Sequence, residues 1–404
     1  MVLGVGGSTI QKELKSMEVM SQDVKPIARR EYLERIKKAS NLMEQHNVDA
    51  IFLSSSTNLQ YFVNLNLVPS ERLHGAVINK SGDIIYISPS FEKAKTESML
   101  TLSGKIITWE EHENPTIIAM NCFTLLGVSK GTIALDENTP FFIVNSLQET
   151  NQFHTFISAE IITKPCREIK SVHEIELIQT AMDITIAVQS HTAKILYEGI
   201  TTHEVQNFVN LAHQKLGSQT PPAFNIVLFG EATAYPHGVS YTQSLQKGDT
   251  VLLDMGASVG GYYSDITRTY TFGKPTRKQR EMWEIERAAQ NALFEAAQIG
   301  ASCESLDFAA RNCLEQFGLG PGYKTPGLPH RAGHGLGLDI HEHPYIVKGN
   351  KNTLAKGMCF SNEPMICLYG EFGVRLEDHI YMTSTGPKWF TKPALSIDNP
   401  FGQD

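Results

Sequence analysis

The sequence lacks paired cysteines, long apolar runs and clusters of basic residues. Its six cysteines are scattered without any Cys-x-x-Cys spacing, which argues against a structural zinc site and against a disulfide framework. No apolar segment approaches transmembrane length, and the N-terminus lacks the basic and apolar regions of a secretory signal. A net charge of -8 disfavours nucleic acid and anionic membranes as partners. We therefore expect a cytoplasmic protein, or a periplasmic or secreted one if a leader was removed.

Length and composition indicate a globular protein of two domains. The chain has 404 residues, of which 41% are hydrophobic and 19% charged. Hydrophobic periodicity predicts an N-terminal arm at residues 1–26, a small mixed-sheet α/β domain at 27–165 and a larger α/β domain at 166–404.

The predicted N-terminal domain alternates helices with short apolar strands. Asn79-Lys80-Ser81-Gly82 joins two of these strands as a hairpin turn. The expected helices cover residues 26–45, 91–102 and 115–126, and the expected strands cover 49–53, 75–78, 83–88, 105–109 and 132–135.

The C-terminal half reads as a helix pair, a hairpin, a second helix pair and a second hairpin. A long helix is expected to begin near Cys166 and to end at Gly199. Capping boxes, Thr201 with Glu204 and Thr276 with Gln279, mark the starts of two further helices. Other expected elements are a strand at 224–229 and helices reaching 298 and covering 303–317.

Five candidate metal ligands fall in the two predicted hairpins and the segment between them. Each arm of each hairpin carries one carboxylate, and an imidazole lies between the hairpins among glycines that allow close backbone approach. The five residues are Asp254, Asp265, His334, Glu363 and Glu377. Four carboxylates converging without a cation would repel one another strongly. The set suits two divalent ions about 3.5 to 4 Å apart.

Each of the five residues also has a simpler interpretation. Asp254 and Asp265 lie beside glycines, where aspartate is common in turns. His334 could be an ordinary loop residue, but Glu363 and Glu377 lie in apolar strands, where an unpaired carboxylate is costly to bury. The glycine-rich segment around His334 lacks the lysine and the strand–loop–helix context of a phosphate loop.

Three segments, 254–269, 330–345 and 362–378, resemble the signature motifs of the pita-bread metallopeptidases. This group contains Xaa-Pro dipeptidases (prolidases), aminopeptidase P and methionine aminopeptidases. The resemblance implies a creatinase-like N-terminal domain followed by a pita-bread catalytic domain, assembled as a homodimer. It also implies two divalent ions per subunit, with manganese favoured over cobalt, zinc or iron.

The resemblance further implies a mechanism and roles for individual residues. A metal-bridging hydroxide would attack the scissile carbonyl, and Glu363 would carry a proton to the leaving nitrogen. His341 would stabilise the oxyanion, and His237 and His330 would line the substrate cleft. The simpler interpretation is that each histidine is a satisfied polar residue near the metals. Arg375, which shares a strand face with Glu377, would orient a ligand or hold a substrate group.

Within the group, the sequence is most similar to a Xaa-Pro dipeptidase that acts on proline-containing di- or oligopeptides. One departure is Tyr345, which stands where several compact dipeptidases have the arginine thought to receive the dipeptide carboxylate. Arg375 or a residue of another chain would then take that role, or the substrates would be longer. Two alternatives stay open: an aminopeptidase P that releases the first residue of Xaa-Pro-Yaa peptides, and a metal-retaining binding module that is not a peptidase.

Overall fold

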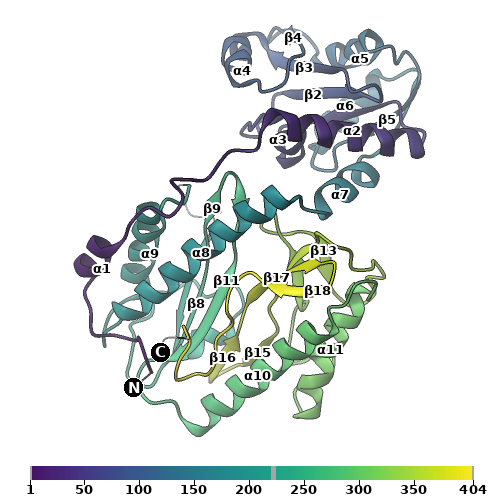
Figure 1. Ribbon diagram of the computed structural model, residues 1–404. Helices are drawn as coiled ribbons and strands as arrows, with labels where there is room; N and C mark the ends of the chain where they lie inside the picture. Colours follow the sequence, from purple (N-terminus) through teal and green to yellow (C-terminus); the bar gives the residue numbers. More distant parts are fainter. Residues whose placement is uncertain (1, 220–223, 403–404) are drawn as a thin grey trace. The chain divides into compact units, whose positions relative to one another are not determined.

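The chain forms two compact units, seen in the computed structural model (Figure 1), which describes residues 2–219 and 224–402. The N-terminal unit is Pro26–Arg167. The C-terminal unit combines the segment up to Lys25 with the chain from Glu168 onward. The N-terminal segment is therefore part of the unit that contains the predicted metal ligands.

The N-terminal unit is built on a mixed six-stranded sheet in the order β4-β3-β2-β1-β5-β6. Strand β1 pairs antiparallel with β2 and parallel with β5, while β3 pairs antiparallel with β2 and parallel with β4. The strands are β1 Ala50–Leu53, β2 Gly75–Asn79, β3 Ile84–Pro89, β4 Lys105–Trp109, β5 Gly131–Leu135 and β6 His154–Ser158. The predicted β2–β3 hairpin and mixed sheet are thus confirmed.

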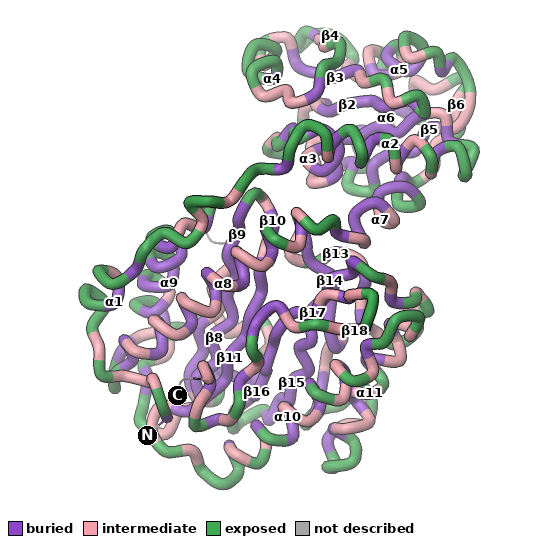
Figure 2. Tube along the Cα trace, viewed as in Figure 1, coloured by how far each residue is buried: buried purple, intermediate pink, exposed green. Residues whose placement is uncertain are grey.

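Helices of the N-terminal unit pack on this sheet through apolar side chains. Their bounds are α2 Arg29–Gln45, α3 Thr57–Val63, α4 Lys93–Met99, α5 Pro115–Leu125, α6 Phe141–Thr150 and α7 Glu160–Glu168, with a 3-10 turn at Ser90–Glu92. Elements α3, α6, α7 and β6 were not predicted from the sequence, because short elements give little periodic signal. Residues of α5 and α6 form one buried cluster with the strands. Buried positions follow the inner strands β1, β2, β3 and β5, whereas the edge strands β4 and β6 are mostly only partly buried (Figure 2).

Two helix pairs organise the C-terminal unit. Helix α8 (Val172–Lys194) packs against α9 (Thr202–Leu216), and α10 (Arg277–Ala296) packs against α11 (Cys303–Gln316). Both predicted capping boxes are present, at the starts of α9 and α10. The prediction that one long helix runs from near Cys166 to Gly199 was wrong at both ends. Cys166 lies in the separate helix α7, α8 ends at Lys194, and Gly199 lies in the following turn.

Short strands of the C-terminal unit form several small sheets between the helices (Figure 1). One has the order β11-β8-β7, another the order β13-β12-β14-β17-β18, and β9-β10 and β15-β16 are two-stranded. The strands are β7 Phe224–Phe229, β8 Thr250–Gly256, β9 Ser258–Val259, β10 Tyr262–Tyr263, β11 Ile266–Thr271, β12 Gly333–Gly335, β13 Glu342–Ile346, β14 Cys359–Asn362, β15 Met365–Leu368, β16 Phe372–Arg375, β17 Asp378–Thr383 and β18 Gly386–Trp389.

The carboxylate-bearing hairpins differ from simple hairpins. The small β9–β10 ribbon is inserted between β8 and β11, so that Asp265 directly precedes β11. In the second pair, β14 pairs with β17 and β15 pairs with β16. Glu363 and Glu377 therefore lie at the two points where the chain leaves one sheet and enters the other. Sequence alternation could not reveal this exchange, since each strand is only four to six residues long.

The N-terminal segment is hydrogen-bonded to the C-terminal end of the described chain. The segment contains α1 (Ile10–Ser16), and the backbone N–H of Leu3 donates to Asp398 O at 2.8 Å, which joins the two ends of the described chain.

Among the described residues, no helix has both the length and the apolar character needed to cross a membrane.

A buried histidine in α9 predicts a loss of stability in mild acid. His213 is fully buried, and burial lowers its pKa from 6.5 to about 4. The unfolded chain therefore binds more protons than the folded chain between these two pH values, so stability falls as the pH drops through this window. This group alone should cost about 2 kcal/mol of unfolding free energy between pH 7.5 and pH 5.

The substitution His213→Leu should remove this part of the pH dependence. Urea unfolding of both proteins at pH 7.5 and pH 5 measures it, and His203→Leu, at an exposed position of the same helix, is the control. An unchanged difference between the two pH values in His213→Leu would contradict the prediction.

Candidate metal centre

The structure brings the five predicted ligands together in the C-terminal unit. Donor atoms within 4.8 Å of one another define three overlapping groups. The groups are Asp254, Asp265 and Glu377; His334, Glu363 and Glu377; and Asp265, His334 and His341. Asp254 lies within β8 and His334 within β12, whereas Asp265, His341, Glu363 and Glu377 each lie directly beside the end of a strand, so the centre exists only where the small sheets meet.

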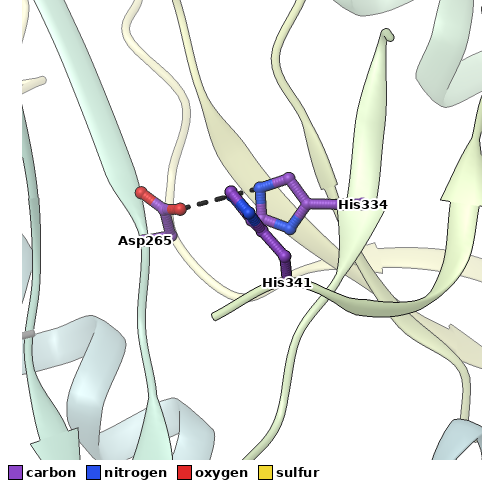
Figure 3. Close-up of side chains that lie close together, drawn as sticks. All are labelled: Asp265, His334 and His341. Atoms are coloured by element: carbon purple, nitrogen blue, oxygen red, sulfur yellow. Dashed lines mark ion pairs between the residues drawn. The ribbon is translucent and has the colours of Figure 1, made fainter. Parts of the chain in front are cut away.

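His334 presents one ring nitrogen to the carboxylates. Its Nδ1 bonds to Gly335 O at 3.0 Å, so Nδ1 carries the proton and Nε2 keeps a free lone pair. Nε2 lies 3.2 Å from Glu363 Oε1. It also lies 3.7 Å from Asp265 Oδ2 (Figure 3). Burial lowers the pKa of His334 to about 3, which keeps the ring neutral. This is the protonation state of a metal-binding imidazole.

The carboxylates are buried and partly without partners. Asp254 Oδ1, Asp265 Oδ1 and Glu377 Oε1 have no hydrogen-bond partner among the described residues. Burial, reinforced by neighbouring carboxylates, raises the pKa of both Asp265 and Glu377 well above the usual value. A cation among these oxygens would remove the repulsion and supply the missing partner. The donor set therefore fits a divalent metal.

Side chains behind the carboxylates hold them in place. The Thr267 hydroxyl donates to Glu377 Oε2 at 2.7 Å and accepts from Arg375 Nε at 3.0 Å. The Arg375 guanidinium also forms an ion pair with Asp254 and donates to Pro236 O at 3.0 Å. Ser361 Oγ donates to Glu363 Oε1 at 3.1 Å and accepts from the His334 backbone N–H at 2.8 Å. Of these three side chains, Arg375 was predicted from strand alternation in the sequence.

The other predicted histidines lie at different depths. His341 is exposed, and its ring centroid is 4.1 Å from that of His334, so it borders the metal centre on its open side (Figure 3). Its pKa falls to about 4, first through burial of part of the ring and then through His334. His330 is half-buried and its Nε2 has no partner among the described residues. His237 is exposed and lines a surface cavity beside β7.

Tyr345 lies next to the centre, and its ring contacts a positively charged side chain. It pairs with His334 across β12 and β13, so the two side chains share a face of the sheet. The Arg331 guanidinium carbon lies 4.6 Å from the Tyr345 ring centroid, a cation–π contact. Arg331 was not predicted from the sequence, because no spacing rule connects it with Tyr345.

His379, which lies near the centre, was also not predicted from the sequence. It is fully buried, neither ring nitrogen has a partner among the described residues, and its ring centroid is 6.0 Å from that of His334. The sequence feature that could have identified His379 is its position two residues after Glu377, a predicted ligand.

Comparisons with known proteins give matches for both parts of the chain. Residues 176–384 match Metallopeptidase family M24, and residues 35–169 match the Creatinase/Prolidase N-terminal domain. The chain is 32% identical to the Xaa-Pro dipeptidase of Pyrococcus furiosus, over 89% of this chain and 98% of the relative. It is also 32% identical to a putative dipeptidase of Bacillus subtilis, over 88% of this chain and 96% of the relative.

Solved structures give the same result for the fold. A prolidase from Thermococcus sibiricus superposes with a TM-score of 0.82 at 28% identity, covering 89% of this chain and 97% of that one. An X-Pro aminopeptidase from Thermotoga maritima gives a TM-score of 0.76 at 25% identity, covering 87% and 96%. The predicted creatinase-like and pita-bread architecture is therefore confirmed, and the family implies a divalent metal.

Thr267 provides a test of the support behind the carboxylates. Thr267→Val keeps the side-chain volume but removes the hydroxyl that bonds both Glu377 and Arg375. We expect the dissociation constant for Mn²⁺ to rise about tenfold, as is typical when a partner of a metal ligand is lost.

Isothermal titration of metal-stripped protein measures that change. Thr271→Val is the matched control, because this buried hydroxyl of the same strand has no partner among the described residues. Equal metal affinity in Thr267→Val and the control would show that the hydroxyl does not support the site.

Proposed function

The chain belongs to metallopeptidase family M24, and we propose that it is a Xaa-Pro dipeptidase that hydrolyses the peptide bond preceding proline in dipeptides. The convergence of His334 with four buried carboxylates carries the proposal. Similarity to a Xaa-Pro dipeptidase along nearly its full length supports the choice of substrate. The proposed domain limits are an arm at 1–26, a creatinase-like domain at 27–165 and a catalytic domain at 166–404.

We propose that Asp254, Asp265, His334, Glu363 and Glu377 hold two divalent ions, with manganese as the first choice. Three overlapping donor groups support more than one ion position. The oxygen-rich set suits manganese, and cobalt, zinc and iron also accept it. When bound, such metals activate water at neutral pH and polarise the scissile carbonyl.

Glu363 is proposed to move the proton. The residue is 9% exposed, more than Asp254, Asp265 and Glu377, at 7%, 5% and 1%. It is therefore the most exposed of the four carboxylates. Its Oε1 would take a proton from the attacking water and deliver it to the leaving imino nitrogen. Ser361 would keep that oxygen oriented.

The histidines are proposed to bind the reacting carbonyl and line the cleft. His341 is exposed next to His334 and would donate a hydrogen bond to the developing oxyanion. The free Nε2 of His330 is suited to a second polar contact with the peptide. His237 would contribute from the β7 side of the cleft.

Arg331 is proposed to bind the dipeptide carboxylate in place of the arginine absent at position 345. Arg375 is buried and already bonds Asp254, Thr267 and Pro236, so its role is to position the ligands. Arg331 is half-buried, stacks on Tyr345 and has no ion pair within the described part of the chain. Tyr345 would thus act in substrate binding by holding this guanidinium at the cleft.

A homodimer is the proposed assembly. Large apolar side chains on α5 and α6 of the N-terminal unit are exposed, which is typical of surfaces that bind another protein. They are Ile117, Leu125, Phe141 and Phe142.

Product release from Ala-Pro and Ala-Pro-Ala tests the reaction. Metal-stripped protein is reloaded with manganese, cobalt or zinc, and we expect Ala-Pro to be the preferred substrate. Glu363→Gln should lower kcat at least a hundredfold, because proton transfer contributes about that factor or more. Glu371→Gln, an exposed carboxylate of the β15–β16 turn, should retain activity.

Three outcomes would contradict parts of the proposed function. Preference for Ala-Pro-Ala would make the enzyme an aminopeptidase P. Failure to cleave either peptide with any metal would favour the binding-module alternative. Full activity of Glu363→Gln would remove Glu363 from the proton-transfer role.

Arg331→Met tests recognition of the carboxylate. We expect the KM for Ala-Pro to rise on the order of 10- to 100-fold with a small change in kcat, since a charge-assisted hydrogen bond is lost. Ala-Pro-amide lacks the carboxylate, so its KM should change little. Arg280→Met, at a surface ion pair with Asp398, is the control. Equal changes for the acid and the amide would exclude this role for Arg331.

A further inference from the structure

Two buried glutamines occupy equivalent places behind the two carboxylate pairs. Gln189 lies on α8, the first helix of the first pair, and Gln290 lies on α10, the first helix of the second pair. Both side chains are fully buried. Each points its amide nitrogen at backbone carbonyls adjacent to candidate metal ligands.

Gln189 joins the residues next to the two aspartates. Its Nε2 donates to Leu253 O at 3.0 Å and to Ile266 O at 2.9 Å. Leu253 directly precedes Asp254, and Ile266 directly follows Asp265. Since both partners are carbonyl oxygens, the amide nitrogen must be the group that faces them. One side chain thus fixes the separation of β8 and β11 where their carboxylates project.

Gln290 joins the residues next to the two glutamates. Its Nε2 lies 3.1 Å from Leu376 O and 3.3 Å from Asn362 O, and these residues directly precede Glu377 and Glu363. The same nitrogen lies 3.2 Å from Asp378 Oδ2. Asn362 Nδ2 donates back to Gln290 O at 2.8 Å, so the strand is tied to the helix in both directions.

A neutral donor is suited to this position. Four carboxylates repel one another until a cation binds, and this repulsion pushes the strands apart. Arg375 already forms an ion pair with Asp254, and a further lysine or arginine behind the ligands would neutralise more of their charge and weaken their attraction for a metal. An amide instead holds the backbone and leaves the ligand charge unchanged, and its hydrogen bonds are strengthened by burial.

We propose that Gln189 and Gln290 are a matched pair of positioning residues, each of which holds one half of the metal centre in binding geometry. Gln189 sets the spacing of Asp254 and Asp265, and Gln290 sets that of Glu363 and Glu377. The inference rests on the proposed metal site, and it is independent of which peptide is cleaved.

A third buried glutamine provides the comparison. Gln279 lies on the same helix as Gln290, and its Nε2 donates to Gly248 O at 2.9 Å and to Thr250 Oγ1 at 3.1 Å. It makes the same kind of bond to the turn before β8 and to the first residue of β8, away from any candidate ligand. Removing the Gln279 amide should therefore lower the stability of the protein, as removing the other two amides would, but it should not lower the affinity for metal.

The experiment compares Gln189→Met, Gln290→Met and Gln279→Met in the full chain. Methionine retains the length of the side chain and removes the donor. Isothermal titration of the metal-stripped proteins with MnCl₂ gives the dissociation constant, and thermal unfolding without metal gives the stability. We expect the dissociation constant to rise about tenfold or more for Gln189→Met and Gln290→Met. For Gln279→Met it should stay within about twofold of the wild type, whatever the change in unfolding temperature.

Other results would overturn the proposal. Wild-type affinity in both test variants, or the same loss of affinity in Gln279→Met, would assign the glutamines to general stability. If a methionine variant does not fold, the corresponding asparagine variants, which keep the amide but shorten its reach, carry the same comparison. A wild-type protein that binds Mn²⁺ but cleaves no Xaa-Pro peptide would refute the proposed function and leave this test intact, whereas failure to bind Mn²⁺ would refute the inference itself.

Discussion

Mutual repulsion among four buried carboxylates is the constraint on which the rest of the C-terminal unit depends. Asp254, Asp265, Glu363 and Glu377 lie where water cannot screen them, and three of their oxygens have no partner among the described residues. Such an arrangement has two requirements: a cation or bound protons must relieve the repulsion, and the surrounding structure must resist separation of the strands. Much of the polar interior of this unit serves that second requirement.

The fold resists the repulsion by placing each carboxylate pair where two strands are already fixed. The glutamates lie at the junctions between the β15–β16 ribbon and the larger sheet, so neither can move without disturbing two sheets. The aspartates lie on β8 and at the start of β11, under α8. Buried side chains then complete the support: Arg375 and Thr267 bond the carboxylates directly, while Gln189 and Gln290 bond the adjacent backbone.

The open side of the centre has a different chemistry. His341 is exposed where the carboxylates are buried, and Arg331 stacks on Tyr345 at the same sheet. These groups carry donors that a peptide could reach, whereas the buried groups are already committed to one another. Under the proposed function, this division would separate metal binding, which needs rigid and dry surroundings, from substrate binding, which needs accessible donors. A tyrosine at position 345 is also accounted for under the proposed function, since Arg331, just before β12, would supply the cation.

Local sequence determined many of the longer elements and the chemical character of the site. Capping boxes located α9 and α10, the turn after Asn79 located a hairpin, and the spacing of five hard ligands indicated a divalent metal. The exchange of strands at Glu363 and Glu377, the glutamines behind the ligands, the contact of Arg331 with Tyr345 and the place of His379 depended on tertiary structure. Patterns of period two or 3.6 report which face of one element is buried. They carry no information about which distant element packs against that face, because such pairings are decided by the packing of the whole unit.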